Sequence, residues 1–104
     1  MDHNNRYNGW TNWETWIVNL WMDNDQKLYQ HFLDITREEV SGNKELCTFT
    51  ISVILREYFD EWAPEIDGLY LDLLNGAMRE VNWREIALHL IEQLSEETYI
   101  ERAN

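Results

Sequence analysis

Glu85, His89 and Glu92 are the side chains whose spacing best fits metal binding. They recur at i, i+4 and i+7, so a helix would carry them near one face, and carboxylate and imidazole groups are both zinc ligands. No second ligand pair with matching spacing occurs elsewhere, and ordinary solvent-facing residues on a helix have the same spacing. We therefore predict no metal and no cofactor, although the spacing leaves a metal site at this triplet open.

The other residues that could do chemistry form no catalytic pattern. Cys47 is the only cysteine, and we expect it to be a small buried apolar residue rather than a reactive thiol. The stretch Asp23-Asn24-Asp25 resembles the start of an EF-hand loop, but Lys27 and Leu28 stand where that loop needs Asp or Asn and then Gly. A glycine-rich phosphate loop and a nucleophile beside a base are also missing. We predict that the protein is not an enzyme.

Acidic side chains form two stretches that could contact a partner. The first has no Lys or Arg between positions 57 and 72, and the second runs from position 92 without a basic residue until Arg102. A charged run is usually a solvated face, but carboxylates on rigid helices can also imitate the phosphates of a duplex. Whether the two stretches meet on one face is left open by the sequence. The candidate partner-binding residues are Glu57, Asp60, Glu61, Glu65, Asp67, Asp72, Glu92, Glu96 and Glu97.

The charge balance restricts the classes of partner. Twenty acidic against eight basic residues leave a net charge of -12 in 104 residues, and the basic residues form no cluster. Because nucleic acids and anionic membranes are bound through Lys and Arg, we expect neither as a direct partner. The expected partner is a protein that is basic or binds nucleic acid. The lack of an apolar run of roughly 20 residues and of a secretory signal predicts a cytoplasmic protein.

Hydrophobic periodicity predicts an all-α fold, a compact bundle of about five helices. Apolar residues recur at i, i+3, i+4 and i+7 in five segments, which capping and turn residues separate. Residues 1–9 are polar and are predicted to form a flexible arm, so the single domain spans 10–104. The helical segments run from Thr11 to Asp23, Asp25 to Ser41, Glu45 to Trp62, Ile66 to Val81 and Asn82 to Leu94.

Two local predictions depend on particular residues. Thr11 followed by Glu14 predicts a capping box at the start of the first helix. Residues 48–53 favour a strand by propensity but keep the helical period, and we predict a helix there. We expect Trp21 to lie inside and Trp10 to be the most exposed tryptophan. The predicted core contains Trp13, Trp16, Leu20, Phe32, Ile51, Leu55, Leu73, Trp83, Ile86 and Leu90.

Two sequence blocks resemble a known group of proteins. The first comprises Trp-Thr-Asn-Trp-Glu-Thr-Trp at 10–16 and Leu-Trp-Met-Asp-Asn-Asp at 20–25, and the second is Val-Asn-Trp-Arg-Glu-Ile-Ala at 81–87. Both are similar to motifs in small uncharacterised proteins of phages, plasmids and some bacteria, including cyanobacteria. The resemblance implies no activity and no site residue. It implies a context, because small acidic proteins of mobile elements often inhibit host defence.

These observations predict an acidic helical binding protein. The favoured function is stoichiometric inhibition of a nucleic-acid-binding or host-defence protein, of the anti-restriction or anti-CRISPR kind, in which the acidic surface mimics DNA. The alternative is a structural or adaptor module that binds a protein through an exposed aromatic patch, with Trp10 as the candidate contact.

Overall fold

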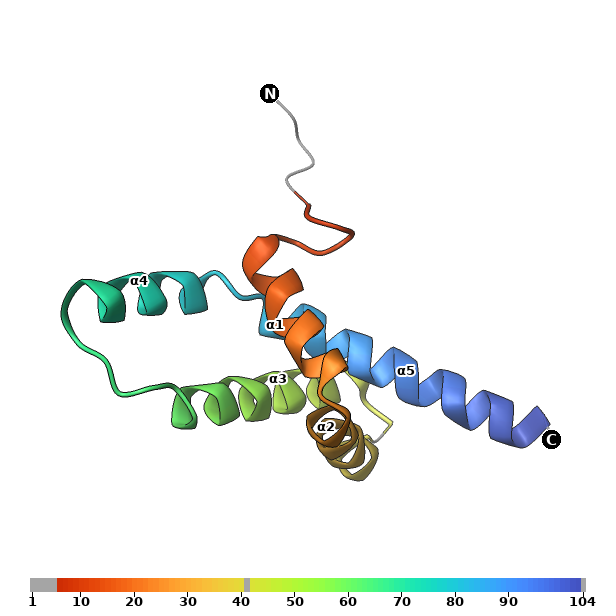
Figure 1. The fold of residues 1–104 in the computed structure, drawn as a ribbon. Helices are drawn as coiled ribbons and strands as arrows, with labels where there is room; N and C mark the ends of the chain where they lie inside the picture. Colours follow the sequence, from red (N-terminus) through yellow and green to blue (C-terminus); the bar gives the residue numbers. More distant parts are fainter. Residues whose placement is uncertain (1–5, 41, 104) are drawn as a thin grey trace.

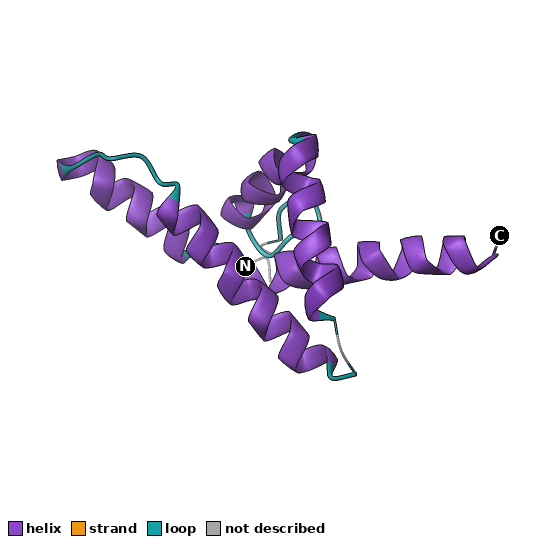
Figure 2. Ribbon diagram, turned by 90° about the horizontal axis from the view of Figure 1, so that it is seen from below, coloured by secondary structure: helices purple, strands orange, loops and turns teal. Residues whose placement is uncertain are grey.

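The computed structural model describes the backbone of residues 6–40 and 42–103 and the side chains of residues 6–40 and 42–94. It confirms an all-α fold, and within these ranges the only β-type pairing is an isolated bridge between Tyr7 and Trp10 (Figures 1 and 2). The helices are α1 (Trp13–Asn24), α2 (Gln26–Glu39), α3 (Lys44–Glu61), α4 (Gly68–Arg79) and α5 (Trp83–Ala103). No helix among the described residues is long and apolar enough to span a membrane.

The core lies where α3 and α5 pack together, with α1 and α2 covering their junction (Figure 1). Apolar side chains from four helices meet there, and Cys47 is buried among them as predicted. Phe32, Ile51, Leu55, Ile86 and Leu90 also occupy the core, which confirms half of the predicted set. The buried cluster contains Met22, Phe32, Leu33, Cys47, Ile51, Leu55, Val81, Ile86, Ala87, Leu90 and Ile91.

Short polar side chains begin most of the helices. Asp25 caps α2 as predicted, since its carboxylate accepts a hydrogen bond from the Leu28 amide at 3.1 Å. The predicted capping box of Thr11 with Glu14 is wrong, because α1 begins one residue later with Asn12 as its cap. Thr11 is instead used in a contact with α5.

Residues 48–53 are helical throughout, as predicted, despite their strand propensity. Cys47, Ile51 and Leu55 are buried at helical spacing, so tertiary packing decides the conformation. The Thr48 hydroxyl donates to the Lys44 carbonyl at 2.7 Å, which satisfies it within the helix. The helix ends at Glu61, shortly before Pro64.

The aromatic face of α1 was predicted to be buried, and this prediction is wrong. Trp13 is 48% exposed and Trp21 is 72% exposed, because the stripe that faces the core is Thr15, Asn19 and Met22. Two of these three residues are polar, so a hydrophobicity pattern selects the wrong side of the helix. Trp10, expected to be the most exposed tryptophan, packs partly buried against the core.

Three other predicted core residues are only half-buried. Trp16, Leu20 and Trp83 lie at the edge of the packed region. Trp16 contacts the Tyr7 ring at a centroid distance of 4.9 Å, and Trp83 stacks on Phe59 at 5.6 Å. These rings therefore close the margins of the core rather than fill its centre.

Helix α4 projects from this core together with the end of α3 (Figure 1). It has no buried residue, and Leu73, predicted to be in the core, is 61% exposed. That prediction is wrong because periodicity identifies an apolar face without showing what covers it. The radius of gyration is 15.2 Å, against about 13 Å for a globular chain of this length.

Replacing Phe32 by Ala should lower the free energy of unfolding by about 3–5 kcal/mol, since Phe32 is fully buried. Trp21→Ala removes a larger ring but should cost less than about 1 kcal/mol, because that ring is mostly exposed. Urea denaturation of both variants measures the difference. Equal losses would contradict the burial pattern of α1 and α2.

Candidate protein-binding surface

The two sequence blocks that carry the resemblance meet at the start of α1 and α5. The buried Thr15 hydroxyl accepts a hydrogen bond from the backbone N–H of Asn82 at 2.8 Å and donates to Asn12 Oδ1 at 2.6 Å. Asn82 Nδ2 also donates to Thr11 Oγ1 at 3.2 Å. We call this set the clasp, comprising Thr11, Asn12, Thr15, Asn82 and Glu85. Its members bond mainly to one another, which gives the motif a structural role.

Glu85 attaches the N-terminal segment to α5. Its carboxylate accepts hydrogen bonds from the Thr11 amide at 2.9 Å and from Arg6 at 2.8 Å. The turn before Thr11 has Asn8 and Gly9 at φ 48° and 88°, the paired positive angles that an Asn-Gly hairpin turn requires. Residues 6–9 of the predicted flexible arm are therefore held by hydrogen bonds, whereas residues 1–5 lie outside the described ranges.

The candidate metal ligands have different surroundings in the structure. Glu85 is occupied by the N-terminal segment, and His89 Nε2 lies 3.7 Å from the Asp23 carboxylate while its ring contacts Trp10. With Glu92 they line a shallow hollow of about 330 Å³ beside Trp10. No group of three or more potential ligands suited to a metal occurs among the described residues.

The first acidic stretch lies on the projection formed by the end of α3, the following loop and α4, here called the α3–α4 arm (residues 56–79). All six of its carboxylate residues are exposed. None of the six forms an ion pair or a hydrogen bond through its side chain with another described residue. Glu57 and Glu61, one turn apart, share a stripe of α3, whereas Asp60 faces α4. The residues are Glu57, Asp60, Glu61, Glu65, Asp67 and Asp72.

The second acidic stretch does not join the first. Glu92 is exposed on α5, and that helix runs away from the core on the side opposite the α3–α4 arm (Figure 1). The side chains of Glu96 and Glu97 lie outside the described residues. The backbone therefore places the two stretches at opposite ends of the molecule, and only the α3–α4 arm presents a described acidic cluster.

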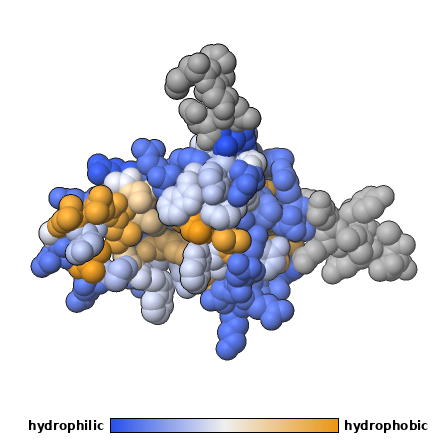
Figure 3. Space-filling model, turned by 45° about the horizontal axis from the view of Figure 1, so that its top comes forward, coloured by the Kyte–Doolittle hydropathy of each residue, from blue (hydrophilic) through white to orange (hydrophobic). Residues whose placement is uncertain are grey.

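The same arm carries large exposed apolar side chains. Trp62, Leu69, Tyr70 and Leu73 are each 61–71% exposed. The space-filling view shows apolar residues gathered at the end of the molecule where α4 lies (Figure 3). Contiguous apolar surface of this kind typically marks an interaction site in a folded protein. Trp10, the aromatic contact expected from the sequence, does not belong to this arm. It is partly buried against the core and contacts the His89 ring.

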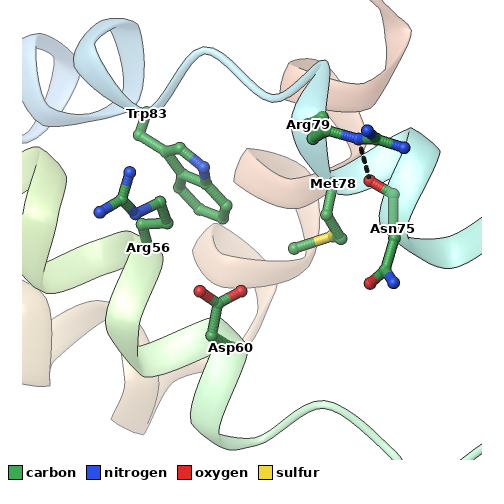
Figure 4. Close-up of a pocket in the computed structure, with 6 residues that line it drawn as sticks. All are labelled: Arg56, Asp60, Asn75, Met78, Arg79 and Trp83. Carbon is green, nitrogen blue, oxygen red and sulfur yellow. Dashed lines mark hydrogen bonds between the residues drawn. The ribbon is translucent and has the colours of Figure 1, made fainter.

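Between the two helices of the arm lies a cleft of about 540 Å³. Arg56 and Asp60 project into it from α3, and Met78 points into it from α4 (Figure 4). Trp83 closes its inner end. Arg56 and Arg79 are among the residues that line the cleft, and neither forms an ion pair with a described residue. Arg79 Nε donates to the Asn75 carbonyl at 3.4 Å (Figure 4).

The exposed apolar side of α4 is a candidate surface that was not predicted from the sequence. Its signal was present, because Leu, Tyr, Ala and Met occupy most positions around this helix. Only Asp72, Asn75 and Arg79 form a polar stripe, at i, i+3 and i+7. A helix that is apolar on more than one side needs more than one covering surface.

Thr15→Val should destabilise the protein by about 1–3 kcal/mol, because it leaves the partly buried backbone N–H of Asn82 without its acceptor. Thr36→Val is the matched control, since Thr36 is equally buried but its hydroxyl only donates to the Phe32 carbonyl of its own helix. That change should cost clearly less than Thr15→Val, because it leaves no backbone N–H without an acceptor. Chemical denaturation in urea compares them, and equal stability of the two variants would refute the structural role of the clasp.

Comparison with known proteins gives the chain a family. No curated protein and no solved structure matches it. A family model described as a family of unknown function, DUF7249, matches residues 3–101, which include both the clasp and the α3–α4 arm. The chain belongs to this family of unknown function.

Proposed function

We propose that the chain is an acidic binding protein that inhibits a basic, nucleic-acid-binding partner by occupying its binding groove. The observation that carries this proposal is the set of exposed carboxylates on the α3–α4 arm, which no described basic side chain neutralises. A host-defence nuclease, of the restriction or CRISPR kind, is the partner class that the sequence context favours.

Rigid placement of the carboxylates supports a role as phosphate mimics. Glu57 and Glu61 are fixed on a helix whose earlier turns are in the core, so their spacing does not depend on a flexible loop. Carboxylates that are fixed before binding speed association with an oppositely charged surface and discriminate against neutral surfaces. Because both carboxylates are exposed, their contribution to the stability of the fold is small.

A structural or adaptor role is the second candidate. The observation that favours it is the exposure of Trp62 and Tyr70, each 71%, since buried aromatic residues commonly supply most of the binding energy in protein interfaces. The two functions differ in their response to salt. Binding through carboxylates weakens as salt rises, because screening shortens the reach of exposed charges to about 8 Å at physiological ionic strength, whereas apolar binding does not weaken.

Two matched double variants test the proposal. Glu57→Gln/Glu61→Gln and Glu38→Gln/Glu39→Gln remove the same charge, the first from the α3–α4 arm and the second from exposed positions on α2. The partner is recovered on the wild-type protein from a host that carries restriction and CRISPR systems. Its dissociation constant is then measured for all three proteins at two salt concentrations.

We expect the arm variant to weaken binding by about 1–2 kcal/mol, which is roughly 5- to 30-fold, and the α2 variant to leave it unchanged. Binding by the wild-type protein should also weaken as salt rises. Salt-insensitive affinity that both variants retain would contradict the inhibitor proposal and favour the adaptor role.

A further inference from the structure

Helix α4 is apolar on two sides. Toward its own chain, Leu74 and Met78 are half-buried, and Met78 points into the cleft beside α3 (Figure 4). On another side Leu69 and Leu73 are 67% and 61% exposed, and they are not among the residues that line the cleft. The chain therefore covers one apolar side of α4 and leaves a second side exposed, which something outside the chain can cover.

We propose that the occupant is a second copy of this chain, with the two α4 helices packed antiparallel about a two-fold axis near Leu73. This inference does not rest on the proposed function, because it uses the leucine face of α4 rather than the Glu57 and Glu61 stripe of α3. A two-fold pairing buries the same patch on both copies, so the patch must be complementary to itself.

The charges at the two ends of α4 meet this requirement. Glu65 and Asp67 precede its first turn, Arg79 is its last residue, and Glu80 follows it. Antiparallel pairing brings Arg79 of each helix to the level of Asp67 in the other. Arg79 has no ion-pair partner among the described residues of its own chain. A parallel pairing would instead bring like charges together, which is unfavourable.

The side-chain sizes along α4 are also complementary. In an antiparallel pair centred on Leu73, Leu69 lies at the level of Ala77 and Tyr70 at the level of Gly76. Each level thus combines a large side chain with a small one, which lets the helices approach closely. The space at Gly76 is open in the single chain, with no atom within 4 Å of where a Cβ would stand.

The outer side of the arm carries several large apolar side chains. Trp62, Ile66, Leu69, Tyr70 and Leu73 are each 38–71% exposed. A standard interface takes approximately 800 Å² from each partner, and side chains of this size are the kind that supply it. The patch is also aliphatic and aromatic at its centre, as in interfaces that are permanently occupied. A second copy is the one occupant that is present whenever the chain is made.

Leu73→Glu and Leu46→Glu test the pairing as a matched couple. The two leucines are 61% and 59% exposed, but Leu46 lies at the start of α3, away from the arm. We expect sedimentation equilibrium to give twice the chain mass of 12.6 kDa for the wild type and for Leu46→Glu. Leu73→Glu should raise the dimer dissociation constant roughly 30-fold or more while helical circular dichroism is retained. A monomeric wild type at 0.5 mM, or an equal effect of both variants, would overturn the proposal.

Charge exchange tests the antiparallel arrangement. Arg79→Glu should weaken the dimer roughly tenfold or more, because it places like charges at both ends of the pair. Adding Glu65→Arg and Asp67→Arg in the same chain exchanges the charges of the two ends and should restore the wild-type dissociation constant. If Arg79→Glu weakens the dimer and the exchange does not restore it, antiparallel pairing is wrong.

Discussion

The hydrogen bond between the Asn82 amide and the buried Thr15 hydroxyl is the constraint on which the arrangement of the helices depends. It joins two segments that lie far apart in the sequence, at the first turns of α1 and α5. Thr15 is fully buried, and a buried polar group that loses a hydrogen-bond partner is costly, so separating the two helix starts lowers the stability. With α5 fixed in this way, its buried face packs on α3 and closes the core.

The clasp also fixes the base of the α3–α4 arm. Helix α4 is connected to α5 by the short segment Glu80–Asn82, and Asn12 Nδ2 donates to the Glu80 carbonyl at 2.7 Å. The other end of the arm continues from α3, whose Ile51 and Leu55 are in the core. Both limbs of the arm are therefore attached to packed structure, although α4 itself buries no residue. An exposed apolar surface held in this manner is preorganised for binding, which lowers the entropic cost of association.

The carboxylates of α3 and the leucines of α4 occupy different sides of the arm. Glu57 and Glu61 follow one stripe of α3, and Leu69 and Leu73 follow the outer face of α4. Pairing through α4 leaves the α3 stripes of both copies exposed, so a dimer would present two sets of unneutralised carboxylates to one partner. Two linked binding surfaces raise the effective affinity for a partner that can engage both. The two proposals are thus compatible in one assembly.

The sequence predicts well where the helices lie along the chain, and less well which of their faces are buried. Helical period and capping residues locate all five helices, and where strand propensity competes with the period in α3, burial of Ile51 and Leu55 decides for helix. Which face of a helix is covered depends on tertiary packing that local patterns do not contain. Trp21 and Leu73 lie on apolar faces without a cover, while the polar Thr15 and Asn19 are buried. The acidic candidates could be named from composition, but their position on a projecting arm required the structure.

Hydrogen exchange measured by mass spectrometry at two protein concentrations tests most directly whether the outer face of α4 is covered by a second copy. Its amides have few tertiary contacts within the chain, so they should exchange quickly in the monomer. At about 100 µM protein we predict slow exchange in residues 69–78, and much faster exchange after dilution below the dissociation constant. Residues 47–55 of α3 and 86–91 of α5 should remain equally protected at both concentrations, because their protection comes from the core. Exchange in α4 that is fast and independent of concentration would contradict the account.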